Sequence, residues 1–170
     1  MSKALTEKRL LNIALFYLGQ YETSEKKLRQ VLTRRVTRMK TQGTEIPPEA
    51  KDWIEAVIAH VREQGYLNND RYAAAQVRVL VGEGRSDRYI LMKLKASGIP
   101  ENTVKKLLEE SGVSERDRAD RYAQKKKVGP YRPQTESPDR KRELGVMASA
   151  GFPYDIAVSV LGTSPAPDEE

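Results

Sequence analysis

Asp70-Arg71-Tyr72-Ala73 recurs further along the chain as Asp120-Arg121-Tyr122-Ala123. A second shared signal follows each copy, Gly98-Ile99-Pro100 after the first and Gly151-Phe152-Pro153 after the second. The distance from the Asp to the Gly is 28 residues in one copy and 31 in the other. This pattern is an internal repeat of about 50 residues. A stack of like modules builds a continuous surface, which is typical of binding proteins rather than of enzymes with a catalytic cleft.

The segments between these signals have the apolar spacing of helices. Leu11, Ala14, Leu15 and Leu18 lie at i, i+3, i+4 and i+7, which predicts the buried face of a first helix. Similar segments follow along the chain, and no stretch alternates as a strand does. We therefore predict an all-α fold of nine helices in three groups of three. Each group is too small to be stable alone, so neighbouring groups must pack in series.

Glycines and capping residues set the predicted boundaries of the repeats. The three repeats are expected at 1–66, 67–112 and 113–162, and an acidic tail at 163–170 is expected to be disordered. Ser24-Glu25 and Ser86-Asp87 each predict the start of a second helix, with the serine as N-cap. Asn69 or Asp70 is expected to cap the helix that opens the second repeat. Tyr72 and Tyr122 occupy equivalent sites, where we expect them to pack one repeat on the next.

Composition narrows the possible chemistry. The chain has 170 residues, 32% of them charged, with no cysteine and only one histidine, His60. Disulfides and thiolate metal sites are therefore excluded, and a histidine-based triad lacks its residues. No apolar stretch approaches the ~20 residues of a membrane span, and the first residues do not resemble a signal peptide. We expect a cytoplasmic protein with no membrane partner, no cofactor, no metal and no catalytic residues.

The net charge of +6 is unevenly distributed. Residues 1–45 carry +6 and residues 114–145 carry +4, whereas 46–113 are balanced and 146–170 carry −4. A basic surface indicates a polyanionic partner such as nucleic acid. The alternative is that these cations only keep the protein soluble.

Three stretches of this sequence resemble the RecX family of recombination regulators. The central one runs from Gly65-Tyr66-Leu67-Asn68-Asn69 through the first repeated word, and continues with Gly84-Arg85-Ser86 and with Leu94 to Gly98-Ile99. Tyr21-Glu22-Thr23-Ser24 is similar to the family's N-terminal repeat, and Gly151-Phe152 to its C-terminal one. The resemblance covers about residues 5–162.

The resemblance implies a regulator of the RecA recombinase in homologous recombination, DNA repair and the SOS response. Members of the family bind RecA and its filament on single-stranded DNA. They inhibit ATP hydrolysis, strand exchange and the coprotease activity, in which RecA promotes self-cleavage of a repressor. The family's fold is an elongated, curved array of three-helix repeats. We expect a monomer, because no long heptad seam indicates a coiled-coil dimer.

A run of cations from 34 to 40 is the first candidate for filament or phosphate contact. Arg34 and Arg38 are four residues apart and share a helical face. Arg35 and Lys40 add charge, and long exposed cations are the side chains that contact phosphates. The alternative is a solvated helix end, where cations complement the helix dipole in any case.

Two further cationic sets are candidates for the same role. Lys125, Lys126 and Lys127 are followed by Arg132 and by Tyr131, which either stacks a base or anchors a loop. Arg85, Arg88 and Tyr89 lie at the start of the second helix of the central repeat, where backbone N–H groups also favour an anion. In the alternative interpretation, Arg85 only pairs with Glu83.

Two other functions remain open from the residues alone. One is a helical DNA-binding module that acts on nucleic acid without a recombinase. The other is a protein-interaction scaffold with no anionic ligand.

Overall fold

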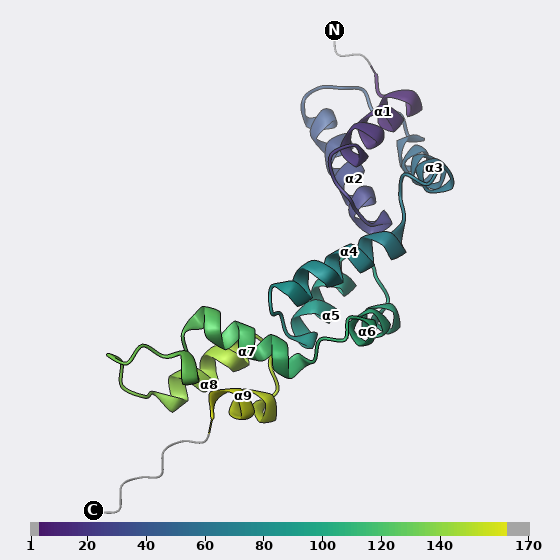
Figure 1. Ribbon diagram of the computed structural model, residues 1–170. Helices are drawn as coiled ribbons and strands as arrows, with labels where there is room; N and C mark the ends of the chain where they lie inside the picture. The colour runs from purple at the N-terminus through teal and green to yellow at the C-terminus, as the bar shows by residue number, and fades with distance from the viewer. Residues whose placement is uncertain (1–3, 163–170) are drawn as a thin grey trace, which may run out of the picture. The chain divides into compact units, whose positions relative to one another are not determined.

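The computed structural model describes residues 4–162, which form α-helices, one short 3-10 helix and no strand (Figure 1). The α-helices of this part are α1 (Glu7–Leu18), α2 (Glu25–Thr41), α3 (Ala50–Glu63), α4 (Asn69–Gly82), α5 (Asp87–Ala96), α6 (Glu101–Glu110), α7 (Glu115–Lys126), α8 (Arg140–Ser149) and α9 (Tyr154–Leu161). The 3-10 helix η1 covers Gly129–Tyr131. The predicted all-α fold is confirmed. The predicted tail at 163–170 lies outside the described residues.

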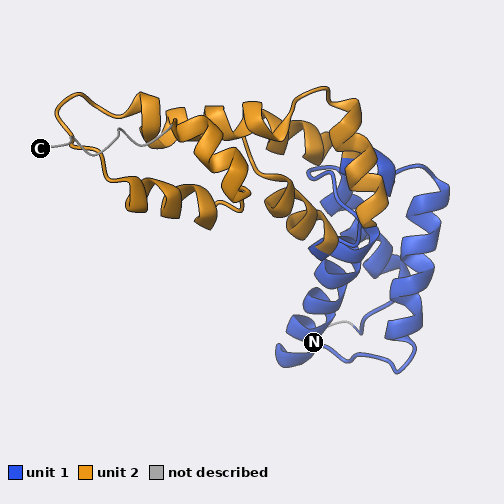
Figure 2. Ribbon diagram, turned by 90° about the horizontal axis from the view of Figure 1, so that it is seen from below, with its two compact units in different colours: residues 1–73, 96–99 blue, residues 74–95, 100–170 orange. Residues whose placement is uncertain are grey.

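The chain divides into two compact units (Figure 2). One comprises residues 1–73 and 96–99, and the other comprises 74–95 and 100–170. The predicted repeat boundaries at 66 and 112 stay a prediction, because this division follows packing and not sequence repetition.

The core of the first unit is formed by α1, α2 and α3. Its buried side chains are Leu10, Ala14, Leu28, Leu32, Ile54, Val57, Ile58, Val61 and Leu67. A smaller cluster joins Leu5, Met39 and Ala50 beside it. The expected face of α1 is partly wrong, because Leu10 is buried with Ala14 while Leu15 is 37% exposed. Residues 10–18 of α1 are apolar on more than one side, so spacing alone leaves the direction of the buried face undetermined.

The second unit has its own core at the C-terminal end, where α7, α8 and α9 pack around η1. The buried members are Ala119, Ala123, Val128, Met147, Phe152, Ala157, Val160 and Leu161. Tyr122 packs against this cluster, with its ring centroid 5.6 Å from that of Phe152. The same unit buries Leu80, Ile90 and Leu94 in the stretch before it.

Each unit contains the same serine contact. Ser24 caps α2 through its hydroxyl oxygen, which accepts from the N–H of Lys27, and the hydroxyl donates to the carbonyl oxygen of Ser97 at 2.6 Å. In the second unit the Ser86 hydroxyl accepts from the N–H of Tyr89 and donates to the carbonyl oxygen of Ala150 at 2.7 Å. The bond from Ser24 to Ser97 helps to explain why residues 96–99 belong with the first unit.

The helix α4 begins differently from the prediction. The side-chain oxygen of Asn68 accepts from the N–H of Arg71 at 2.9 Å, so Asn68 and not Asn69 or Asp70 provides the capping bond. The side-chain oxygen of Asn69 accepts instead from the N–H of Glu25 at the start of α2. Because Asn68 satisfies the helix end, Asn69 is available for this contact.

Candidate functional site

The cationic run of the first unit lies along one exposed side of α2. Arg34, Arg35 and Arg38 are all exposed. With Val31 they line one wall of a groove of about 550 Å³. These wall residues are spaced as i, i+3, i+4 and i+7, so they follow a single helical face for two turns.

The opposite wall of this groove is α1. Its lining residues are Arg9, Asn12, Ile13, Phe16 and Tyr17. They also share one helical face, since they recur at i, i+3, i+4, i+7 and i+8. Phe16 is 71% exposed, which is high for a phenylalanine beside a folded core. The sequence prediction missed this wall, although its spacing was visible beside the face that was chosen.

The groove has a single sign of charge. Among the described residues, the ionisable side chains that line it are those of Tyr17 and four arginines, and no carboxylate of residues 4–162 does. Within residues 4–162, neither Arg34, Arg35 nor Arg38 forms an ion pair with a carboxylate. Their guanidinium groups are therefore available to an anionic ligand.

Lys40 lies apart from these arginines. It lines a different groove, next to Arg29, Glu55 and the Pro47-Pro48 loop. Arg29 and Glu55 form an ion pair there with Nε and Oε1 2.6 Å apart. The hydrogen bond to Arg29 lowers the pKa of Glu55 below its usual value. The structure thus separates Lys40 from Arg34, Arg35 and Arg38, with which it was grouped.

The cations at the start of α5 are partly occupied within the second unit. The Nε of Arg85 donates to Glu83 at 3.2 Å, and its guanidinium lies 4.5 Å from the centroid of the Tyr89 ring. The alternative interpretation, in which Arg85 pairs with Glu83, therefore describes the observed contact. Arg88 is exposed. The binding roles of Arg85, Arg88 and Tyr89 stay predictions.

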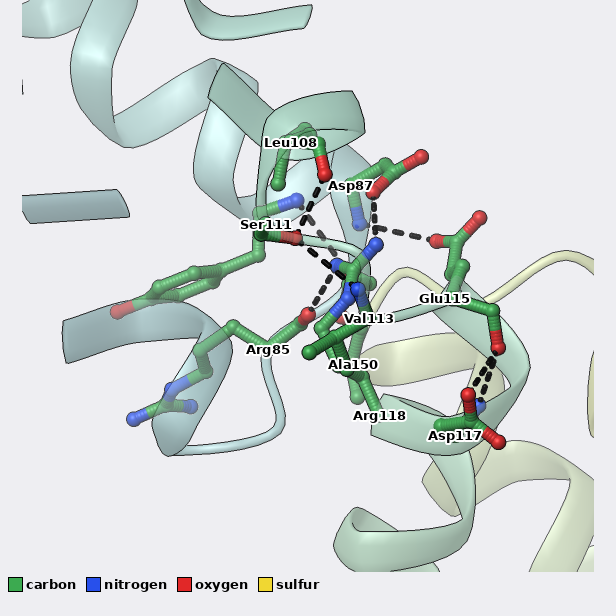
Figure 3. A network of polar contacts seen from close by, with 12 residues as sticks. Arg85, Asp87, Leu108, Ser111, Val113, Glu115, Asp117, Arg118 and Ala150 are labelled. Atoms are coloured by element: carbon green, nitrogen blue, oxygen red, sulfur yellow. Dashed lines mark hydrogen bonds and ion pairs between the residues drawn. The ribbon is translucent and has the colours of Figure 1, made fainter. Parts of the chain in front are cut away.

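Next to Arg85 lies a buried arginine, Arg118, that the sequence pattern did not single out (Figure 3). The side chain of Arg118, from α7, is only 2% exposed. It donates to the carbonyl oxygen of Arg85 at 2.7 Å and pairs with the carboxylate of Asp87. Glu115 accepts from the N–H of Asp87 at 2.9 Å. Burial raises the pKa of the Glu115 carboxyl above its ordinary value. The Arg118–Asp87 pair lies inside the unit and holds α7 against the start of α5, which is a structural role.

The last cationic set is dispersed. Lys125 donates to the carbonyl oxygen of Glu83 at 3.2 Å, and Lys126 lies 5.6 Å from the Tyr122 ring centroid. Lys127 ends α7 in the left-handed conformation, with φ at 55°, and is exposed. The three lysines therefore form no single binding face, and their binding role stays a prediction.

Arg132 and Tyr131 anchor the loop that follows. Arg132 forms an ion pair with Glu143, whose side chain is 6% exposed, at 2.6 Å. The same carboxylate accepts from the N–H of Gly129 at 3.1 Å. The Tyr131 hydroxyl donates to Asp120 at 2.7 Å, as the loop-anchor interpretation expects. The binding role predicted for Arg132 stays a prediction, although its guanidinium is already paired.

The groove between α1 and α2 is thus the described surface with the strongest potential for binding. It combines Arg34, Arg35 and Arg38, which form no ion pair with a described carboxylate, with the exposed side chain of Phe16. Such a surface binds an anion or an acidic partner.

Known proteins similar to this chain decide its family. The regulatory protein RecX of Myxococcus xanthus strain DK1622 is 41% identical over 162 residues, which cover 92% of this chain and 86% of that protein. The chain belongs to the RecX family. The regulatory protein RecX of Agrobacterium fabrum strain C58 is 30% identical over 153 residues, covering 88% of this chain and 80% of that protein. Both RecX relatives are named as regulatory proteins and not as enzymes.

Solved RecX structures share the fold. A crystal structure of the regulatory protein RecX aligns with a TM-score of 0.63 at 20% identity, over 91% of this chain and 70% of that one. A crystal structure of RecX from Lactobacillus salivarius aligns with a TM-score of 0.56 at 19% identity, over 91% of this chain and 94% of that one. No protein-family model matches the chain. In residues 4–162, no helix has the length and apolar character needed to cross a membrane.

Proposed function

We propose that this RecX-family chain regulates the RecA recombinase by binding RecA and its filament on single-stranded DNA. Binding inhibits ATP hydrolysis, strand exchange and the coprotease activity, and the chain itself catalyses no reaction. The observation that carries the proposal is the 41% identity to a RecX regulatory protein across 92% of the chain.

The arginine wall of α2 is the proposed contact with the filament. Arg34, Arg35 and Arg38 project from one helical face and are unpaired with carboxylates in the described residues. Guanidinium groups bind carboxylates and phosphates in the same bidentate geometry, so this wall suits either an acidic protein surface or a DNA backbone. Arg88, Lys40 and Lys127 are exposed and are proposed as secondary contacts.

Occupation of a filament surface is sufficient for inhibition. A protein bound across neighbouring recombinase subunits restrains the motions that each cycle of ATP hydrolysis requires. If the filament alternates between two conformations during the ATP cycle, the bound protein shifts their populations only by the difference between its affinities for the two conformations. No catalytic group on the bound protein is needed for this effect.

Charge reversal separates this proposal from its alternatives. The variant Arg34→Glu/Arg35→Glu/Arg38→Glu is compared with the charge-preserving Arg34→Lys/Arg35→Lys/Arg38→Lys. Binding to RecA filaments and to bare oligo(dT) is measured by fluorescence anisotropy at several salt concentrations. The proposal expects filament binding to weaken on charge reversal while binding to bare DNA is weak for every variant.

Two other results would assign a different function. Strong binding to bare DNA that charge reversal abolishes, with log affinity falling by about 0.7 per phosphate contact and log unit of salt, indicates a DNA-binding module that needs no recombinase. Filament binding that is unchanged by charge reversal indicates a scaffold whose cations serve only solubility.

A further inference from the structure

The groove between α1 and α2 has an apolar side that phosphate contact does not use. Ile13, Phe16 and Tyr17 supply it from α1, and Val31 supplies it from α2. A phenylalanine that is 71% exposed beside a groove of about 550 Å³ is typical of a surface that another molecule covers. Arginines alone would bind an anion without needing this apolar wall.

We infer that this groove binds an acidic amphipathic helix of a partner protein. Apolar side chains of that helix contact Phe16 and Ile13, and its carboxylates pair with Arg34 and Arg38. This inference rests on the proposed function in one respect, because both assign a binding role to Arg34 and Arg38. It adds the kind of molecule that the groove binds.

The geometry of the two walls favours a helix as occupant. Both walls are single helical faces of about two turns, which is roughly 10 Å of helix length. A third helix packs between two others by placing an apolar stripe at i, i+3, i+4 and i+7 into the groove that they form. The required stripe has the same period as the walls themselves.

The charge of the groove favours an acidic partner. Four arginines line it, and no carboxylate of the described residues does, so the charges of a basic helix would be repelled. Aromatic and arginine side chains together are also the residues that dominate binding energy in protein interfaces.

Single-stranded nucleic acid is the competing occupant, and the lining makes it less suitable. A nucleic-acid track stacks successive bases on several aromatic faces. In this groove Phe16 is the exposed aromatic, because Tyr17 is half-buried and packs in a tilted arrangement against Tyr21, with ring centroids 5.0 Å apart. The remaining apolar wall is aliphatic.

The test uses the full chain and three labelled probes. The first is a fluorescein-labelled peptide of about 18 residues, long enough to become helical on binding, with leucines at i, i+3, i+4 and i+7 and glutamates elsewhere. The second has lysine at each glutamate position, and the third is oligo(dT). Binding is measured by anisotropy for the unmodified chain, Phe16→Ala, Arg34→Glu/Arg38→Glu, and the matched control Tyr154→Ala, which removes an aromatic that is 74% exposed on α9.

The inference expects the glutamate peptide to bind and the lysine peptide not to bind. Phe16→Ala should weaken binding of the glutamate peptide about tenfold, which is typical of an interface anchor. Arg34→Glu/Arg38→Glu should weaken it at least as much, and Tyr154→Ala should leave it unchanged. Circular dichroism confirms that each variant keeps its helical content.

Three results would overturn the inference. They are no binding of the glutamate peptide, equal binding by the unmodified chain and Phe16→Ala, or a loss of oligo(dT) binding in Phe16→Ala with peptide binding unchanged. RecA inhibition by the unmodified chain is measured in parallel. Inhibition without peptide binding overturns the inference alone, whereas peptide binding without inhibition overturns the proposed function alone.

Discussion

The hydroxyl of Ser86 donates to the carbonyl oxygen of Ala150, 64 residues further along the chain, at a distance of 2.7 Å. The residue after Ala150 is the Gly151 that opens the second repeated Gly-x-Pro turn. Ser24 makes the matching contact with Ser97, just before Gly98. A helix-capping serine and a glycine turn are therefore joined in the same way once in each unit.

The first prediction concerns these two serines. Ser24→Ala and Ser86→Ala each remove a capping bond and the bond to a distant carbonyl oxygen, which is buried at Ser97 and part-buried at Ala150, so each should lower the free energy of unfolding by about 2 kcal/mol. Ser114→Ala is the control, because exposed Ser114 caps α7 without a bond to a distant carbonyl and should cost about 1 kcal/mol or less. Urea denaturation measures the difference. Equal losses at all three serines would show that the distant bonds contribute nothing.

The second prediction concerns the glycines that follow the acceptor carbonyls. Gly98 has φ at +82°, and a Cβ built on it would lie 2.9 Å from the Cβ of Lys26. Gly151 has φ at +90°, and its Cβ would lie 2.8 Å from the Ser86 hydroxyl oxygen. Gly65 has a similar φ of +77° with nothing within 4 Å.

Gly65→Ala should therefore lower the free energy of unfolding by about 1 kcal/mol, from backbone strain alone. Gly98→Ala and Gly151→Ala should each cost more by on the order of 1 kcal/mol, because a neighbour must also move. Thermal and urea unfolding of the three variants make the comparison. A loss at Gly65 as large as at the other two would mean that these turns are not closely packed.

The third prediction concerns Arg118, which is 2% exposed. Arg118→Met should lower the free energy of unfolding by about 2 kcal/mol, because it leaves the carbonyl oxygen of Arg85 and the partly exposed carboxylate of Asp87 without their partner. Arg116→Met, on the exposed side of the same helix, should change it by less than about 0.5 kcal/mol. If the two variants have equal stability, the buried network is not holding the second unit together.

The fourth prediction concerns the pH dependence introduced by Glu115. Burial raises the pKa of its carboxyl in the folded state, so the protonated form is favoured by folding and the ionised form is disfavoured. This contribution to stability is fully present below the ordinary glutamate pKa of about 4.3 and is lost as the pH rises through the raised value.

Glu115→Gln keeps the acceptor oxygen for the N–H of Asp87 and removes the charge. It should therefore be more stable than the unmodified chain at pH 7, and this difference should shrink on acidification to about the ordinary glutamate pKa. Glu109→Gln, on the exposed end of α6, serves as the control. Urea denaturation at both pH values gives the comparison, and a Glu115→Gln variant that gains stability on acidification relative to the unmodified chain would contradict the sign.

Local signals in the sequence were sufficient for the fold class. Ser24 and Ser86 cap α2 and α5, as the Ser-acid pairs predicted, and Gly98 and Gly151 have the positive φ of helix-ending turns. These signals depend on neighbours within four residues, so one sequence contains them in full.

Contacts between distant segments could not be predicted in the same way. The bond from Ser86 to Ala150 and the burial of Arg118 depend on how helices pack, and an arginine in an acidic helical stretch normally indicates an exposed face. The candidate site was likewise predicted only in part. Arg34, Arg35 and Arg38 were predicted from their clustering, whereas Phe16 was missed because α1 is apolar on two sides and only packing shows which side stays exposed.

RecA regulation by this chain is measured by titrating the chain into RecA that is hydrolysing ATP on single-stranded DNA. We predict that hydrolysis falls with increasing concentration, and that Arg34→Glu/Arg35→Glu/Arg38→Glu requires a concentration at least about tenfold higher for the same inhibition, as expected for the loss of about 1.4 kcal/mol of binding energy. A rate of ATP hydrolysis that stays constant at every concentration of the unmodified chain would contradict it.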